Sequence, residues 1–280
     1  NEYTALTSDA AAGATTLSVT ASGLNTNNRF ASTLAAGDLI MIIQMQGVTL
    51  LGQPDSLYPF FSNPDNATWG DIISYNNCGN YELCQVASVP NSSSIVIDCG
   101  LIHDYTVAGR VQIVRIPRYN TLTITSPGVL SCDAWNGTTG GVLAVEVKGA
   151  TILNAGGKIN VSGKGFRGAA LYNPSPSRSQ FPWFSSTNTE MSANKGEGIA
   201  GSGADLIPYG GQYGRGAAAN AGGAGNVWNC GGGGGANAGI VASWTGMGNP
   251  DTSTAGWIAA WNLEYTGFAS STSSGGGRGG

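Results

Sequence analysis

The stretch from Lys195 to Ile240 constrains the fold of this 280-residue chain more than any other, because glycine recurs there in steps of three. A three-residue period belongs neither to an α-helix nor to a β-strand, but it is the period of the polyproline-II helix. Without a Cβ atom, extended chains can lie close together and hydrogen-bond side by side. The glycines that keep this period are Gly198, Gly201, Gly210, Gly216, Gly222, Gly225, Gly231 and Gly234.

Two structures remain open for this glycine tract. Flexible glycine linkers usually carry Ser, Gln or Lys between the glycines. This tract instead carries side chains that favour burial, namely Tyr209, Tyr213, Val227, Trp228 and Cys230. We therefore expect a polyglycine-II-like bundle with glycine at its shared interior, and we keep the flexible linker as the alternative.

The charge content excludes several classes of partner. Charged residues make up 10% of the chain, whereas an average domain has about 25%. Only 12 residues are Lys or Arg and the net charge is −4, so we expect no nucleic-acid partner. No apolar run is long enough to predict a membrane span. A surface this poor in charge suits an extracellular or assembled protein.

Residues 1–118 have the pattern of an all-β domain, a small β-barrel or sandwich. Short runs of alternating apolar residues are separated by turns. The longest apolar run, Leu39–Ile43, predicts a strand that is buried on both faces. The other expected strands are Ala14–Thr20, Tyr81–Val89, Ser94–Cys99 and Arg110–Ile116.

Residues 119–170 change in character to short strands between Gly and Asn turns. The segments LTIT, LAVEV, TIL and INVS each supply alternating apolar residues. This pattern favours the coils of a β-solenoid over a hairpin meander. Trp135 lies beside a turn, where a large aromatic ring can cap the stack of coils or form a platform for a sugar; we favour the cap.

Residues 171–280 form the predicted glycine-rich domain, which we expect to continue beyond residue 280. Two loops interrupt it, at 171–194 and 241–273. The first contains Trp183, and the second contains Trp257 and Trp261 at helical spacing. These tryptophans are candidate ligand contacts, although such a stripe more often serves packing.

The five cysteines predict one disulfide bond, between Cys84 and Cys99. Two strand-like runs flank a turn at Pro90–Ser93, and counting outward from Val89 opposite Ser94 brings the two cysteines face to face. The pairing of Cys78, Cys132 and Cys230 stays open. No cysteine or histidine spacing indicates a zinc site.

No arrangement of residues predicts catalysis. The single histidine, His103, is followed by Asp104, but adjacent residues of a strand face opposite ways. No nucleophile elbow or phosphate loop occurs, and no spacing singles out a pair of carboxylates. We therefore expect no enzymatic activity, no cofactor and no metal.

Several stretches together resemble the N-terminal region of large, adhesin-like surface proteins of Bacteroidota and other gliding bacteria. The stretches are AAGDLIMIIQMQG, NYELCQV, VQIVRIPRYNTLTIT, AWNGTTGGVLAVEVKG, INVSGKGFRGAA, KGEGIAG and GRGAAANAGGAGNVWNCGGGGGANAG. The resemblance implies secretion, often by the type IX system, and a role in a surface filament or gliding motility. The glycine tract separately resembles the packed polyglycine-II bundles of phage tail-tip adhesins.

Three functions follow as expectations. The first is a non-enzymatic structural or adhesion module on the cell surface, with surface or secretion-machinery proteins as partners. The second is a secreted carbohydrate-binding or carbohydrate-degrading protein that uses exposed tryptophans on a surface glycan. The third is a subunit that assembles with copies of itself.

Overall fold

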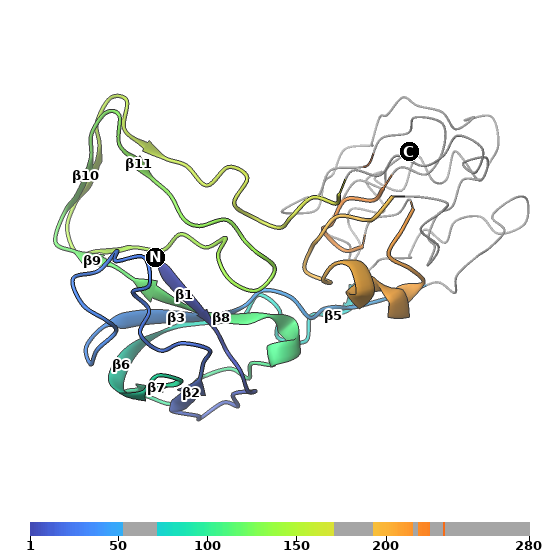
Figure 1. Ribbon diagram of the computed structural model, residues 1–280, viewed down its shortest axis with the longest axis horizontal. Helices are drawn as coiled ribbons and strands as arrows, with labels where there is room; N and C mark the ends of the chain where they lie inside the picture. The colour runs from blue at the N-terminus through green and yellow to red at the C-terminus, as the bar shows by residue number, and fades with distance from the viewer. Residues whose placement is uncertain (53–71, 171–192, 215–217, 225–231, 233–280) are drawn as a thin grey trace, which may run out of the picture. The chain divides into compact units, whose positions relative to one another are not determined.

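A computed structural model describes residues 1–52, 72–170, 193–214, 218–224 and 232. The chain forms two compact units. Unit 1 comprises Asn1–Gln46 with Asn77–Phe166, and unit 2 comprises Gly47–Asn76 with Arg167–Gly280. The described residues are mostly β, with two short 3-10 helices, η1 and η2 (Figure 1). This confirms the predicted β class.

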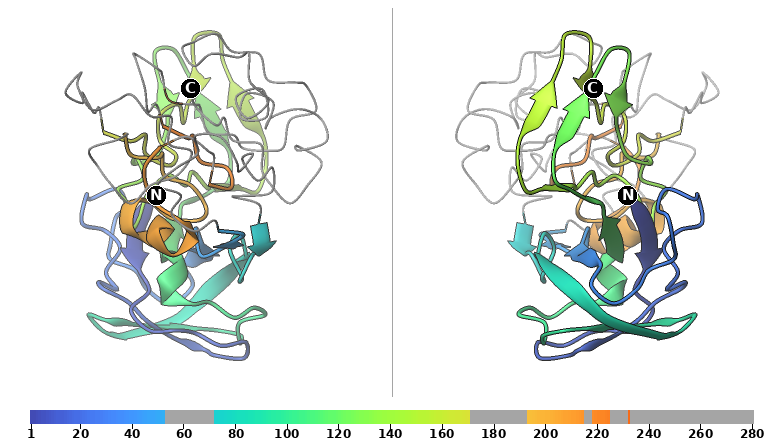
Figure 2. Two further views of the ribbon diagram at one scale, coloured as in Figure 1. Left: turned by 90° about the vertical axis from the view of Figure 1, so that its right-hand side faces the viewer. Right: turned by 90° about the vertical axis from the view of Figure 1, so that its left-hand side faces the viewer.

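Unit 1 is built on a six-stranded antiparallel sheet in the order β1-β8-β3-β6-β7-β2. Figure 2 shows this sheet in the lower part of both views. Its strands are β1 (Glu2–Ala5), β2 (Thr16–Ser18), β3 (Leu39–Gln44), β6 (Tyr81–Asn91), β7 (Ser94–Ile97) and β8 (Val111–Ile116). Beyond the edge strands β1 and β2, Leu6 forms a bridge with Val19, and the Thr7 N–H donates to Ser18 O at 2.9 Å. The sheet therefore curls into a half-barrel, which is closer to the barrel than to the sandwich, the two forms that the sequence left open.

The hydrophobic core lies on the concave face of this curled sheet. Alternate residues of β3 enter it, so Ile40 and Ile42 are fully buried, whereas Leu39 and Met41 on the other face are half-buried. The expectation that this strand is buried on both faces was therefore wrong. The strand with that property is the neighbouring β8, because residues near Gly140 also cover its outer face.

Two successive coils of chain follow the sheet, and their strands pair in parallel. The coil strands are β9 (Arg118–Tyr119), β10 (Leu122–Ile124), β11 (Val129–Leu130), β12 (Glu146–Val147), β13 (Thr151–Leu153) and β14 (Lys158–Ile159). Each pair joins residues 28 or 29 positions apart, as in Arg118↔Glu146 and Leu122↔Thr151. Parallel pairing at a nearly constant offset is typical of a solenoid, whereas the strands of a hairpin meander pair antiparallel. We call residues 118–135 coil 1 and residues 146–164 coil 2.

The described part of unit 2 contains a short β pair and a 3-10 helix. The pair is β4 (Thr49–Leu50) with β5 (Ile72–Ser74), and the 3-10 helix η2 spans Gly203–Tyr209. The shorter helix of the chain, η1 (Val107–Gly109), belongs to unit 1. Ser202 and Asp205 form a capping box at the start of η2, which explains locally why a helix begins inside the glycine tract.

The structure does not confirm the polyglycine-II-like bundle. A polyproline-II helix needs φ near −75°, whereas Gly201, Gly210 and Gly214 have φ of +98°, +103° and +82°. Close glycine packing is nevertheless present, because the Gly196 N–H donates to Gly222 O at 2.8 Å. A Cβ added at Gly198 would lie 2.6 Å from Asn220 Oδ1. The predicted glycines Gly216, Gly225, Gly231 and Gly234 lie outside the described residues.

Candidate functional site

The predicted disulfide between Cys84 and Cys99 is not formed, since both residues are free thiols. The expected register holds at this end of the ladder, where Val86 pairs with Ile97. However, β7 ends at Ile97, so Cys99 lies beyond the strand and is exposed, whereas Cys84 is buried in the core. Cys78 and Cys132 are free as well, and Cys230 lies outside the described residues.

Burial makes two of these thiols poor nucleophiles. It raises the pKa of Cys78 to about 11 and that of Cys84 to about 12. The nucleophile is the thiolate, and at neutral pH both groups therefore stay protonated. The pKa of the exposed Cys99 is also raised, chiefly by a hydrogen bond with Asp98.

Trp135 is buried in unit 1, which excludes the exposed sugar platform that was the alternative to a packing role. Its side chain is buried, and its ring meets that of Phe166 edge-on at a centroid distance of 5.9 Å. Its backbone N–H donates to Lys164 O, which continues the coil-to-coil pairing beyond the strands. A buried ring has no face free for a sugar. Trp183, Trp257 and Trp261 lie outside the described residues.

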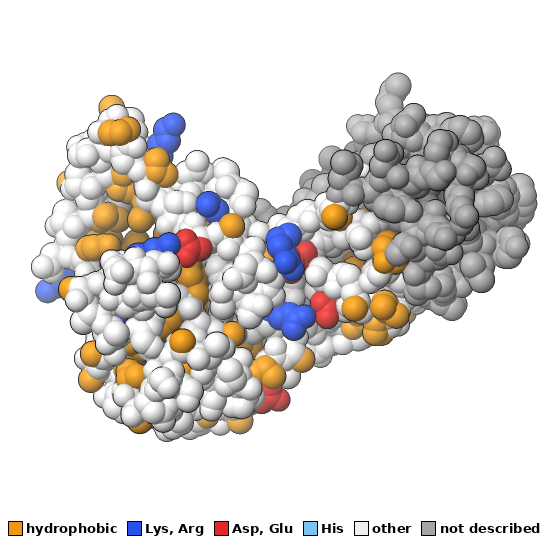
Figure 3. All heavy atoms as spheres, in the orientation of Figure 1, with side chains coloured by type: hydrophobic (Ala, Val, Ile, Leu, Met, Phe, Trp, Pro, Cys, Tyr) orange, Lys and Arg blue, Asp and Glu red, His pale blue; other side chains and the backbone are white. Residues whose placement is uncertain are grey.

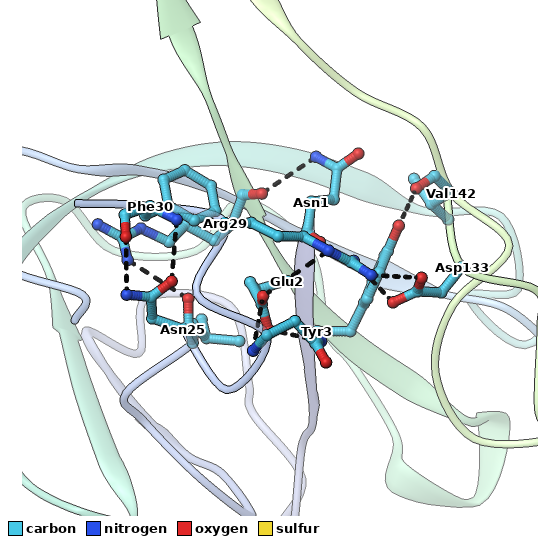
Figure 4. Close-up of polar contacts among 11 residues, drawn as sticks. Asn1, Glu2, Tyr3, Asn25, Arg29, Phe30, Asp133 and Val142 are labelled. Carbon is cyan, nitrogen blue, oxygen red and sulfur yellow. Dashed lines mark hydrogen bonds and ion pairs between the residues drawn. The ribbon is translucent and has the colours of Figure 1, made fainter. Parts of the chain in front are cut away.

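Sequence reasoning missed a polar cluster that fastens the coils to the sheet (Figure 4). Asn1 Nδ2 donates to Ala144 O at 2.7 Å, and the Ala144 N–H donates back to Asn1 Oδ1 at 3.1 Å. The Tyr3 hydroxyl donates to Val142 O at 2.7 Å. Strand β1 thereby holds residues 142–144, which lead from coil 1 into coil 2.

An ion pair extends this attachment cluster. Both terminal nitrogens of Arg29 donate to the two carboxylate oxygens of Asp133, each at 2.7 Å. The hydrogen bond from Arg29 lowers the pKa of Asp133 below its ordinary 3.8. The ion pair therefore stabilises the fold at pH values above 3.8, and this stability is lost as the pH falls through the lower pKa that Asp133 has in the folded state. Because Arg29 and Asp133 are 37% and 43% exposed, this contribution is small.

A third attachment lies on the outer face of β8. The side chain of Gln112 is fully buried, and its Nε2 donates to Gly140 O at 2.9 Å. The Gly140 N–H in turn donates to Gln112 Oε1 at 2.8 Å. The Gln112 amide thus satisfies both the N–H and the C=O group of Gly140. Gly140 has a φ of +96°, a backbone conformation that favours glycine.

The buried charges of the described residues also hold backbone in place. In unit 1, Arg115 is 3% exposed, pairs with Asp38 at 2.7 Å and donates to Ser32 O at 2.8 Å. In unit 2, Glu197 accepts from the Arg167 side chain at 2.7 Å and from its backbone N–H at 3.1 Å. Lys195 Nζ donates to Gly214 O at 2.9 Å.

The far end of the coils is open. In-register parallel strands point paired side chains the same way, so Leu153 stacks on Ile124. Ile124 is 7% exposed, whereas Leu153 is 53% exposed because no described strand lies beyond it. Figure 3 shows hydrophobic and basic side chains together on this part of unit 1. The sequence shows the alternating apolar residues of this strand, but it does not show that the strand lies at the open end of the coils.

The described residues contain neither a membrane-spanning helix nor a metal-binding cluster. No helix there is long and apolar enough to cross a membrane. In the same ranges, no group of three or more His, Cys, Asp or Glu side chains is placed to hold a metal ion.

No protein-family description and no curated protein matches this chain. Among solved structures, it is similar to the tailspike gp61 of Pseudomonas phage phi297 (17% identity, TM-score 0.24) over 47% of this chain and 18% of that chain. It is similar to the tailspike gp49 of Pseudomonas phage LKA1 (16% identity, TM-score 0.23) over 46% of this chain and 18% of that chain. It is also similar to the Gp54 tailspike of Acinetobacter baumannii phage AP22, which was solved with a capsular saccharide (15% identity, TM-score 0.24). This match covers 62% of this chain and 26% of that chain. The chain spans about a quarter or less of each tailspike, and scores this low define no shared overall fold.

Proposed function

We propose that this chain is a non-enzymatic structural and adhesion module of a large secreted cell-surface protein. The observation that carries the proposal is the attachment of the coils to the sheet. Strand β8 (Val111–Ile116) runs almost directly into β9 (Arg118–Tyr119), so sheet and coils share one stretch of backbone. Three side chains, those of Asn1, Tyr3 and Gln112, then bind the segment 140–144 that joins the two coils.

The use of polar side chains inside unit 1 supports a mechanical role. Gln112 and Arg115, which could carry chemistry elsewhere, are buried and bonded to loop carbonyls. Bonds of this kind stiffen a fold, because breaking one leaves a buried polar group without a partner. A stiff base with projecting coils suits a protein that transmits force between a cell and a surface.

The cell-surface setting rests on the sequence resemblance to adhesin-like proteins of gliding bacteria and on the low content of charged residues, 10%. In this setting the module is exported, and its partners are surface or secretion-machinery proteins, a surface glycan or copies of itself. Glycan binding through tryptophans is the second function we carry forward. It depends on Trp183, Trp257 and Trp261, since Trp135 is buried.

Adhesion under flow tests the first function. The full chain is coupled to beads, and the shear needed to detach them is measured on glass, on polystyrene and on bacterial cells. We expect more shear for these beads than for albumin-coated beads on at least one surface. Gln112→Leu, which loosens the coils, should lower that shear, whereas Gln85→Leu on the exposed side of β6 should not.

Two results would contradict this function. One is detachment at the albumin level on every surface. The other is sustained hydrolysis of a polysaccharide, ester or peptide by the purified chain that is lost when one acidic residue is changed. A glycan array distinguishes the second function, because binding there should collapse when Trp183, Trp257 or Trp261 is changed to Ala.

A further inference from the structure

Coil 2 exposes apolar residues whose counterparts in coil 1 lie beneath another coil. The two coils carry equivalent apolar columns, Ile124 with Leu153 and Leu130 with Ile159. Coil 2 covers coil 1, so Ile124 is only 7% exposed, whereas Leu153 and Ile159 are 53% and 52% exposed. Coil 2 therefore lacks the cover that it provides to coil 1.

The backbone of coil 2 is open along the same edge. In the described part of the chain, β13 pairs only with β10, and β14 pairs only with β11. Their outer edges thus present N–H and C=O groups that can accept another strand. A polypeptide in extended conformation can satisfy these groups and cover the apolar side chains at once.

The charged residues of coil 2 indicate which kind of polypeptide can bind there. Its charged residues are Glu146, Lys148, Lys158 and Lys164. Glu146 forms an ion pair with Arg118, whereas neither Lys148 nor Lys158 forms a salt bridge with a described residue, and both are exposed. A second copy of coil 2 would bring lysine against lysine, and like charges directly opposed in a sheet are destabilising.

We propose that the open end of the coils binds an extended, acidic polypeptide segment, which adds a third coil by parallel strand pairing. Strands in a sheet lie about 4.7–4.9 Å apart, so residues in register become direct neighbours. The bound segment would carry apolar residues over Leu153 and Ile159 and a carboxylate over Lys158. This surface exists whether or not the chain serves adhesion, so the two proposals stand or fall separately.

A pair of peptides tests the proposal against the full chain. The acidic peptide copies residues 146–162 with Lys148→Glu and Lys158→Glu, and the basic peptide keeps both lysines. Fluorescence anisotropy at low salt should show that the acidic peptide binds about tenfold more tightly, since each charge reversal replaces repulsion by attraction. The difference should shrink at high salt, which screens exposed charges.

Two protein variants locate the binding. Leu153→Ser should abolish binding of both peptides, whereas Val129→Ser should not, although Val129 is equally exposed, at 54%, on coil 1. Circular dichroism checks that both variants stay folded. Changing Lys148 and Lys158 of the protein to Glu should reverse the preference, so that the basic peptide binds more tightly.

Four outcomes would overturn the proposal. Neither peptide binds up to millimolar concentration, both bind equally well at low salt, or Leu153→Ser binds like the wild type. The fourth is a different occupant. A dimer in solution that Leu153→Ser dissociates would assign this end to a second copy. Displacement of the acidic peptide by polygalacturonate, with binding of the polymer unaffected by Leu153→Ser, would assign it to an anionic polysaccharide.

Discussion

At the scale of single residues, the buried Arg115 is expected to contribute more to stability than an exposed arginine such as Arg118. Its guanidinium is 3% exposed, pairs with Asp38 and lies 4.0 Å from the Phe30 ring centroid. Arg115→Met leaves the Asp38 carboxylate and the Ser32 carbonyl without this donor, and should lower the free energy of unfolding by about 2–4 kcal/mol. Arg118→Met removes an exposed pair and should cost at most about 1 kcal/mol. Urea unfolding measures both, and equal costs would contradict the structural role of Arg115.

The thiols give a second prediction at this scale. Native protein treated with iodoacetamide at pH 8 should be alkylated at the exposed Cys99, whereas Cys84 should react only after denaturation. The pKa of Cys84, about 12, lies above its ordinary value of 9.0, so the buried neutral thiol stabilises the fold below pH 9. That stability declines as the pH rises toward 12. Peptide mapping identifies the alkylated cysteines. A Cys84–Cys99 cross-link found in the map would contradict the free thiols and support the disulfide that the sequence predicted.

At the scale of elements, the amide of Gln112 joins β8 to the segment between the coils. Gln112→Leu keeps the volume but leaves the Gly140 N–H and C=O unpaired in a buried site, at about 1–3 kcal/mol for each group. Hydrogen exchange should quicken at the Gly140 amide first. Gln85→Leu is the matched control, because Gln85 is exposed and makes a single 3.3 Å bond to Gly37 O. Unchanged exchange at Gly140 in Gln112→Leu would mean that other contacts hold the coils.

The stacking of the coils gives another prediction for elements. A Cβ at Gly157 would lie 2.3 Å from Ile124 O, on the backbone of the neighbouring coil. Gly157→Ala should push the coils apart and cost about 1–3 kcal/mol. Gly165→Ala meets nothing within 4 Å and should be nearly neutral. Thermal unfolding distinguishes them, and equal melting temperatures would contradict the close approach of the coils.

At the scale of the whole molecule, the two compact units should respond separately to damage. Gly198→Val places a branched side chain against Asn220 and Ala221, so it should disrupt the glycine packing of unit 2. Hydrogen exchange should then quicken at Gly196 and Gly201, while β3 and β8 of unit 1 keep their protection. If residues 198–224 exchange freely in the unchanged protein, the flexible linker describes the tract better. Loss of protection in both units at once would show that they unfold together.

The predictions from sequence succeeded where the signal was local. Alternation of apolar residues located β3, β6, β7 and β8 to within a few residues, because a half-buried strand repeats every two residues. The same signal found the segments that pair in parallel in the coils. It missed β1 (Glu2–Ala5), because the buried positions of this strand are the polar residues Glu2 and Thr4. It also missed β11 (Val129–Leu130), whose two residues are too few to show a pattern. It also missed the attachment cluster, because Asn1 and Ala144 are 143 positions apart.

By itself, then, the sequence determined the β class, the turns and the approximate strands of this protein, since these depend on neighbouring residues. Only the tertiary structure decided which apolar face stays uncovered, which charges are buried and how the glycines are used. Leu153 and Ile124 have the same local pattern, and only the presence or absence of a further coil makes one exposed and the other buried. The three-residue glycine period predicted extended chains, but the capping box at Ser202 favours a helix at the same place. A 3-10 helix forms there because its hydrogen bonds are made within the segment itself.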